Sequence, residues 1–163
     1  MIPLFREQIR LGHPLTLTDP NMTRFLMSLE DAVGLVEHAF TQARAGDLFV
    51  RKSPAGTVAD LAQAVCEVEG VTPDIQVIVT RHGEKLFETL LSREEMHRAS
   101  DEGDFFRVPL DARSLDYGLY FDHGGEKIWK EDDFSSHNAP RMNQTDIVTL
   151  LLGLPEFAGF STR

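Results

Sequence analysis

The chain has 163 residues, of which 42% are hydrophobic and 26% charged, and its formal net charge is -10. A chain of this length buries roughly 70% of the surface that it exposes when unfolded, and the composition excludes a disordered or fibrous protein. The negative charge argues against non-specific nucleic-acid binding, because it repels phosphate wherever basic residues are scattered. We therefore expect a globular protein that does not bind nucleic acid.

The cysteine content and the first residues indicate a cellular compartment. The single cysteine, Cys66, has no partner for a disulfide, which is typical of a reducing compartment. Its apolar neighbours favour a buried helical side chain over a reactive thiol. The segment 1–7, MIPLFRE, has no basic region and no long apolar run, so we expect no signal peptide and no membrane span. These features predict a cytoplasmic protein.

The first part of the chain alternates between helical and strand patterns. Apolar residues at helical spacing predict a helix over residues 2–11, and two short strands are expected over 15–18 and 23–27. A sequence similar to a capping box at Ser28–Asp31 opens a second helix that extends to Gly46. Its apolar face contains Leu29, Ala32, Val33, Val36 and Phe40.

The next segments continue the alternation. Residues 48–50 have a strand pattern, and Thr57 begins a helix that ends at Gly70. A strand of the buried type is expected over residues 75–79. The sequence thus predicts an α/β fold.

The character of the sequence changes near residue 92, where a charged stretch begins. We predict two lobes, residues 1–91 and residues 92–163. Within the second lobe we expect a loop-rich segment from Pro109 to Arg141 and a last helix over 145–152. None of the six histidines belongs to an HExxH motif, and one cysteine does not complete a zinc site. We therefore predict no metal site.

Two segments contain candidate anion-binding residues. The segment 80–85, TRHGEK, directly follows a predicted strand, which is where α/β proteins build ligand sites. Arg81 can act there as a bidentate clamp for phosphate, or it can form a surface pair with Glu84 worth at most about 1 kcal/mol. Arg24, flanked by Met22 and Phe25, is either a ligand for an anion or a side chain that extends to solvent over apolar neighbours. The spacing alone leaves both alternatives open.

Five segments together resemble a known family: IPLFREQI (2–9), PLTLTDPNMTRFLMSLEDAVGLV (14–36), TRHGEKLFETLLSREE (80–95), DFFRVPLDARSLDYG (104–118) and DDFSSHNAPRM (132–142). They are similar to the carboxy-terminal part of capsular-polysaccharide UDP-N-acetylglucosamine 4,6-dehydratase/epimerases of bacteria, which are extended short-chain dehydrogenase/reductases. The resemblance covers essentially the whole chain. It implies a carboxy-terminal substrate-binding lobe without the complete Rossmann domain.

The resemblance also implies which residues bind substrate. In that family the matching MTRF and RxGEK positions contact the uridine diphosphate part of a UDP-sugar. Thr23, Arg24, Arg81 and Glu84 are therefore the substrate-site candidates, with the two arginines toward the diphosphate and Glu84 toward a ribose hydroxyl. Val79 departs from the family pattern, which commonly has glycine at this position.

The motifs for catalysis and for NAD(P) binding are absent from the sequence. No GxG occurs, and the residues four positions after Tyr117 and Tyr120 are Phe121 and Gly124 rather than lysine. The resemblance places a Gly-rich cofactor turn and a catalytic Tyr-xxx-Lys in the other half of the family's fold, so we expect no catalytic or cofactor-binding residue in this chain.

Three hypotheses remain open at the level of sequence. The chain is the substrate-binding half of a nucleotide-sugar dehydratase/epimerase, a stand-alone UDP-sugar-binding or regulatory module, or a remnant without function. The expected partners are a UDP-sugar and either a Rossmann half or a second copy of the chain. In such families the strand over 48–50 joins the cofactor-domain sheet, so we expect its edge to be exposed here. The position of Met1 within the family pattern favours a truncated form.

Overall fold

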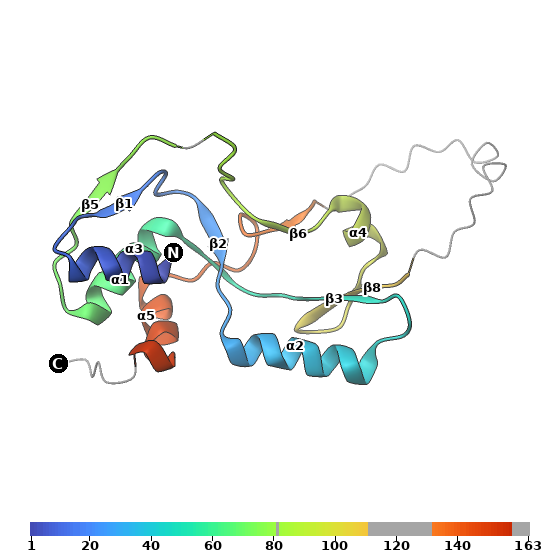
Figure 1. Cartoon of the computed structure of the whole chain (residues 1–163). Helices are drawn as coiled ribbons and strands as arrows, with labels where there is room; N and C mark the ends of the chain where they lie inside the picture. Colours follow the sequence, from blue (N-terminus) through green and yellow to red (C-terminus); the bar gives the residue numbers. More distant parts are fainter. Residues whose placement is uncertain (81, 111–131, 158–163) are drawn as a thin grey trace. The chain divides into compact units, whose positions relative to one another are not determined.

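The computed structural model describes residues 1–80, 82–110 and 132–157 (Figure 1). The chain divides into two compact units, and each is assembled from segments that are distant in sequence. Helices and strands alternate along the chain, which confirms the predicted α/β class. The segments are Met1–Asp31, Ser53–Glu88 and Ser135–Arg163 in unit 1, and Ala32–Lys52 and Thr89–Phe134 in unit 2.

These units differ from the two lobes that we predicted, residues 1–91 and residues 92–163. The chain passes from unit 1 to unit 2 after Glu88, close to the predicted boundary. The other points at which the chain passes from one unit to the other were not predicted, because they depend on contacts between distant segments. Strand β3 (Leu48–Arg51) pairs with β8 (Phe105–Val108), which brings an early segment into unit 2.

Helix α3 (Val58–Glu69) is the centre of unit 1, where it contacts α1 (Ile2–Arg10) and α5 (Gln144–Leu152) (Figure 1). Helix α3 begins after Thr57, whose hydroxyl accepts a hydrogen bond from the Asp60 amide. It ends at a glycine in the left-handed region, as predicted. The buried side chains of the core come from all three helices and include Phe5, Leu61, Ala62, Val65, Ile147 and Leu151.

Two local features complete the helical part of unit 1. Helix α5 begins after Asn143, which forms a capping box with Asp146, so the predicted last helix is confirmed. The 3-10 helix η2 (Pro155–Phe157) follows, and its buried Phe157 ring lies 4.6 Å from the Arg6 guanidinium carbon. Cys66 is buried on α3 as predicted, and this burial raises the pKa of its thiol.

Two short two-stranded sheets lie beside these helices. Strand β1 (Leu15–Leu17) pairs in parallel with β5 (Ile75–Val77), with the first residue of each strand opposite the other. Strand β2 (Thr23–Phe25) pairs in antiparallel fashion with β4 (Ala55–Thr57), with Arg24 opposite Gly56. The leucines of β1 are buried, and β1 contacts α1 and α3. The parallel pair is thus fixed to the helical core through β1.

Strand β5 is shorter and more exposed than the buried strand that we predicted over residues 75–79. It ends at Val77, whose side chain is exposed, and Val79 beyond it is 89% exposed. Among the described residues β5 pairs only with β1. The apolar composition of a strand shows that it favours burial but not that another layer covers its faces, so the prediction of a buried strand was wrong for Val77 and Val79.

Unit 2 is built on a three-stranded antiparallel sheet in the order β3-β8-β7, in which β7 is Ser100–Asp101. Helix α2 (Leu29–Gln42) precedes β3, and its His38 ring stacks on Phe105 at 4.1 Å between ring centroids. Helix α4 (Arg93–Arg98) begins with a capping box. Strand β6 (Thr89–Leu91) pairs with β9 (Phe134–Ser135). Of these elements only the two-residue strand β9 lies in the segment between Pro109 and Arg141 that we predicted to be rich in loops, and residues 111–131 of that segment lie outside the described residues.

Asp47 links the start of β3 to β8. Its Oδ2 atom accepts hydrogen bonds from the Arg44 amide at 2.8 Å and from Arg107 Nε at 2.8 Å, and Arg107 Nη2 lies 2.6 Å away. The hydrogen bond from the Arg44 amide and the guanidinium of Arg107 favour the ionised carboxylate, so they lower the pKa of Asp47.

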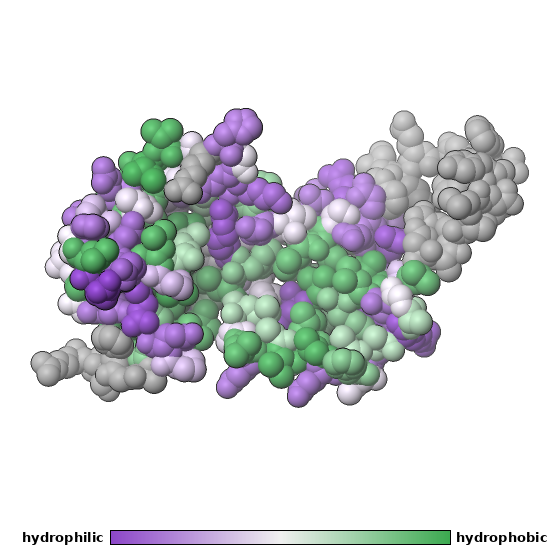
Figure 2. Space-filling view, in the orientation of Figure 1, coloured by the Kyte–Doolittle hydropathy of each residue, from purple (hydrophilic) through white to green (hydrophobic). Residues whose placement is uncertain are grey.

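Four apolar side chains of α2 are exposed rather than covered by other described residues. Leu29, Val33, Val36 and Phe40 follow one another at helical spacing, and all four are exposed, Phe40 by 87%. Figure 2 shows hydrophobic residues gathered along this helix. Among the described residues, β3 pairs with β8 on one side only, so its other edge is open, as we predicted. We name these four side chains the α2 stripe.

No helix in the described part of the chain is both long enough and apolar enough to cross a membrane.

The first prediction concerns the pH dependence of unit 2. Because the folded-state pKa of Asp47 is lowered, the stabilising contribution of this carboxylate is present above the ordinary value of 3.8 and is lost as pH falls through the folded-state value. Asp47→Asn should lower the free energy of unfolding at about pH 6 and have a smaller effect near pH 3, below the ordinary value of 3.8. Urea unfolding at both pH values measures this. Asp104→Asn, at an exposed position of the same unit, is the control. A pH-independent effect of Asp47→Asn contradicts the prediction.

The second prediction is self-association through the α2 stripe. Burying an exposed Phe side chain against another copy contributes about 2 kcal/mol, or roughly thirtyfold in the dissociation constant. We expect concentration-dependent sedimentation for the wild type and a shift toward monomer for Phe40→Glu. Thr41→Glu, which adds the same charge to the next residue outside the stripe, should behave like the wild type. A wild-type monomer at all concentrations would show that the stripe does not associate.

Candidate functional site

The candidate site lies where the two parallel strands of unit 1 end. Thr18 directly follows β1, and the Ile78 amide beyond β5 donates a hydrogen bond to the Leu17 carbonyl at 2.7 Å. Ligands in α/β sheets commonly bind at the carboxyl ends of parallel strands, because loops from different strands meet there. The segment 80–85 begins at this end of β5, which agrees with its position in the sequence prediction.

Glu84 is fixed at this end of the sheet by Thr18. The Thr18 hydroxyl donates a hydrogen bond to Glu84 Oε1 at 2.7 Å, across 66 residues of sequence. Gly83, directly before Glu84, has a φ of 81°, in the left-handed region that glycine adopts without steric cost. The turn at Gly83 and the hydroxyl of Thr18 thus place the Glu84 carboxylate.

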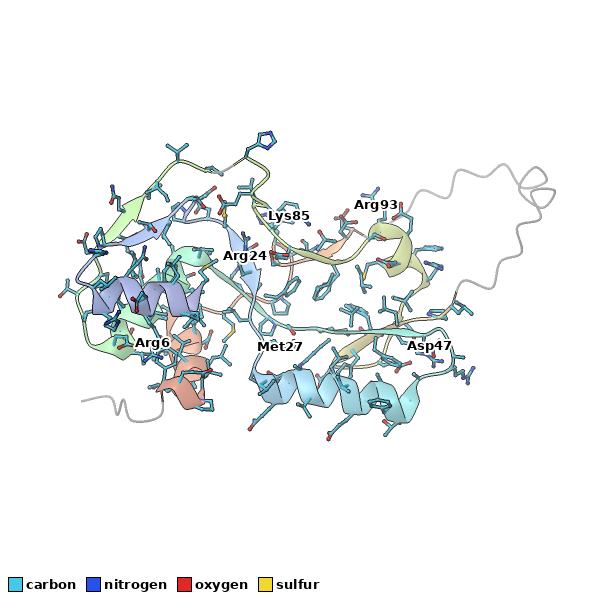
Figure 3. All side chains as sticks on the ribbon, in the orientation of Figure 1. Arg6, Arg24, Met27, Asp47, Lys85 and Arg93 are labelled. Atoms are coloured by element: carbon cyan, nitrogen blue, oxygen red, sulfur yellow. The ribbon has the colours of Figure 1, made fainter. Side chains whose placement is uncertain are left out.

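Arg24 lies on β2, and its guanidinium faces the backbone of the segment after Glu84. Its Nη2 donates to the Lys85 carbonyl at 2.9 Å, and its Nη1 donates to the carbonyls of Thr23 at 2.8 Å and of Leu86 at 3.4 Å. Figure 3 shows the side chain of Arg24 beside Lys85. Arg24 Nε is 3.5 Å from Glu88 Oε1. Three neutral carbonyls orient the guanidinium, and the Glu88 carboxylate forms an ion pair with it.

The segment after Lys85 is held against β2 by backbone hydrogen bonds as well. The Thr23 amide donates to the Leu86 carbonyl at 2.9 Å, and the Ser136 amide donates to the Glu88 carbonyl at 2.8 Å. The Thr23 and Ser136 hydroxyl oxygens are 2.8 Å apart, and both residues are buried. Residues from β2, from 85–88 and from 135–136 therefore form one hydrogen-bonded cluster.

The structure brings three of the four predicted site residues into this region and leaves the fourth outside the described residues. Arg24 bonds to the carbonyl of Lys85, the residue directly after Glu84. The Thr23 side chain instead points into the interior and bonds to Ser136. Arg81 lies outside the described residues, so its pairing with Glu84 stays untested. Val79, which departs from the family pattern, is exposed.

Sequence reasoning missed two residues that hold this region together, Thr18 and Ser136. Thr18 belongs to a segment that we interpreted as a strand and a turn, and nothing in its spacing connects it to Glu84. Ser136 lies in the SSHN element (135–138), which contributed to the family resemblance but received no role. The only signal for either residue was the polar side chain itself, because both contacts join segments more than 45 residues apart.

The chemistry available at this site is that of binding. A carboxylate at Glu84 can accept hydrogen bonds from sugar hydroxyls, and a guanidinium at Arg24 can stabilise an anion. Across the described parts of the chain, no three His, Cys, Asp or Glu side chains are grouped in a way that could hold a metal ion.

Comparisons with known proteins decide the family. The model of the polysaccharide biosynthesis protein family matches residues 1–110, and that of the polysaccharide biosynthesis protein C-terminal region matches residues 111–157. The chain belongs to the polysaccharide biosynthesis protein family. This confirms the broader part of the sequence resemblance.

Relatives and a solved structure agree with this membership. The chain is 51% identical over 154 residues to the UDP-glucose 4-epimerase of Rickettsia canadensis (strain McKiel) and 50% identical over 154 residues to that of Rickettsia prowazekii (strain Madrid E). Each match covers 94% of this chain and 45% of the relative, so the chain spans about half the length of these curated relatives. The X-ray structure of Pen from Bacillus thuringiensis matches with a TM-score of 0.74 and 28% identity, over 93% of this chain and 44% of that chain.

The third prediction tests the turn that places Glu84. Gly83→Ala should destabilise unit 1 by about 1 to 2 kcal/mol, because a side chain disfavours the left-handed region, and Gly83→Asn should cost less. No atom outside the turn lies within 4 Å of the added Cβ, so the effect is conformational. Gly34→Ala is the control, since this glycine is helical and equally uncrowded. Equal urea-unfolding midpoints for Gly83→Ala and the wild type would contradict the account of this turn.

Proposed function

We propose that this chain is the UDP-sugar-binding part of a nucleotide-sugar epimerase or dehydratase of bacterial surface-polysaccharide biosynthesis. The observation that carries the proposal is that Arg24 of the MTRF segment contacts the backbone directly after Glu84, while Glu84 itself is held at the carboxyl end of β1. Thr18 holds Glu84 there, and Arg24 contacts the carbonyls that follow it. Family membership and the names of the Rickettsia relatives support this class of function.

The roles that we propose follow the charges of the ligand. Arg81 and Arg24 bind the diphosphate, because a chain of net charge -10 has no general attraction for an anion and needs local charge-assisted hydrogen bonds. Glu84 accepts a hydrogen bond from a ribose hydroxyl. Thr23 supports the site from the interior: its hydroxyl bonds to Ser136, and its carbonyl accepts a hydrogen bond from Arg24.

The substrate and the reaction are part of the same proposal. The sequence resemblance favours UDP-N-acetylglucosamine and a 4,6-dehydratase/epimerase reaction, whereas the Rickettsia relatives are named for UDP-glucose and 4-epimerisation. Hydride transfer in either reaction needs NAD(P), and we propose that the residues for it come from a Rossmann half, as a partner of this chain. The proposed location is the cytoplasm.

The fourth prediction is weak UDP binding that depends on the two arginines. We expect a millimolar dissociation constant, about 4 kcal/mol in all. Arg81→Ala and Arg24→Ala should each weaken binding about tenfold to a hundredfold, because each removes charge-assisted hydrogen bonds worth roughly 1.5 to 3 kcal/mol. UDP titration followed by NMR shifts measures this. Arg10→Ala is the matched control, since Arg10 is an exposed arginine of the same unit that pairs with Glu7.

Several outcomes of this titration separate the alternatives. If UDP binds and neither arginine variant weakens it, the assigned site is wrong. If UDP shifts no resonance, a remnant without function is favoured. UDP-glucose and UDP-N-acetylglucosamine, titrated in parallel, compare the two proposed substrates. Both should remain unconverted and NAD(P) unbound, because the sequence has no GxG and no Tyr-xxx-Lys. A 4-keto product above a no-protein control would overturn that expectation.

A further inference from the structure

The hydroxyl of Ser136 uses all of its hydrogen-bonding capacity inside the cluster. Its Oγ donates to the Thr23 carbonyl at 3.0 Å and accepts from the Glu88 amide at 2.9 Å. The Thr23 hydroxyl, 2.8 Å away, supplies the second hydrogen bond that Oγ accepts. A serine hydroxyl has one donor and two acceptor positions, so each is occupied. The side chain is 0% exposed, so water does not compensate for the loss of these bonds.

The partners of Ser136 are also partners of the proposed ligand groups. The Thr23 carbonyl that accepts from Ser136 accepts from Arg24 Nη1 as well. The Glu88 amide that donates to Ser136 belongs to the residue whose carboxylate lies beside Arg24 Nε. One hydroxyl therefore fixes both sides of the Arg24 guanidinium, on β2 and on the segment after Glu84.

The neighbouring serine has no such role in the cluster. The Ser135 amide and hydroxyl both bond to Asn138 Oδ1, at 2.9 and 3.2 Å, so its side chain stabilises its own turn. Ser135 and Ser136 are adjacent, similarly buried and chemically identical, but of the two side chains only that of Ser136 bonds to the segments that contain Arg24 and Glu88. This difference provides a matched control within the chain.

We propose that Ser136 is a positioning residue of the nucleotide site: from the carboxy-terminal region it holds residues 86–88 against β2 and so orients Arg24 for an anionic ligand. This inference rests on the proposed function. Without the hydroxyl, the Glu88 amide and the Thr23 hydroxyl lose a partner, and the segment opens more often. The apparent affinity for a ligand falls with the fraction of molecules in the binding-competent arrangement.

The first measurement needs no ligand. In Ser136→Ala, hydrogen exchange of the Glu88 and Thr23 amides should become about tenfold faster, while the amides of α3 keep the wild-type rate. Ser135→Ala should leave the Glu88 and Thr23 amides unchanged. Ser136→Cys, which keeps the volume but bonds more weakly, should fall between the wild type and Ser136→Ala, and it replaces the alanine variant if that variant does not fold.

The second measurement is UDP affinity, followed by NMR shifts. Ser136→Ala should weaken UDP binding about tenfold if about one molecule in ten keeps the competent arrangement. Ser135→Ala should bind like the wild type. Val65→Ala, which removes a buried side chain of α3, lowers stability away from the site. It should therefore leave the affinity unchanged at temperatures where it is folded.

These outcomes decide the proposal. Faster exchange at Glu88 together with weaker UDP binding, in Ser136→Ala alone, supports it. Unchanged exchange at Glu88, an equal loss of affinity in Val65→Ala, or failure of both Ser136 variants to fold overturns it, because Ser136 would then have no role or only a general structural one. If the wild type binds no UDP, the proposed function fails. The exchange measurement still shows whether Ser136 fixes residues 86–88.

Discussion

Unit 1 depends on one buried group of hydrogen bonds, in which the Ser136 hydroxyl joins Thr23 to Glu88. The three segments that meet there are far apart in sequence, and each has little regular structure of its own. Buried polar groups that lack a partner are costly, so a fully bonded cluster permits only one arrangement of these segments. The positions of Arg24 and of the residues after Glu84 follow from this arrangement, as does the return of the chain to unit 1 at Ser135.

The features that sequence reasoning predicted correctly are those with local causes. The cap at Thr57 and the apolar spacing of α3 depend on residues within a few positions of one another. Burial was harder to predict. The α2 stripe has the spacing of a core-facing helix but is exposed, and β5 has the composition of a buried strand but has one neighbour among the described residues. Composition shows which side chains favour burial, but it does not show whether anything covers them.

Long-range pairing was not predictable from one sequence. Strands β3 and β8 are joined across more than 50 residues, and neither carries a signal that selects the other. At the candidate site, Arg24 and Glu84 were identified through the family resemblance, whereas Thr18 and Ser136 were missed because they act on other segments of the protein.

The buried cysteine on α3 has a consequence for observing this molecule. Thiol reagents react with the thiolate. In the folded state Cys66 reacts slowly for two reasons: its side chain is buried, and its raised pKa leaves less thiolate. It is also the only cysteine of the sequence. The rate of its modification therefore reports how often the core of unit 1 opens, without any introduced label and without a signal from unit 2.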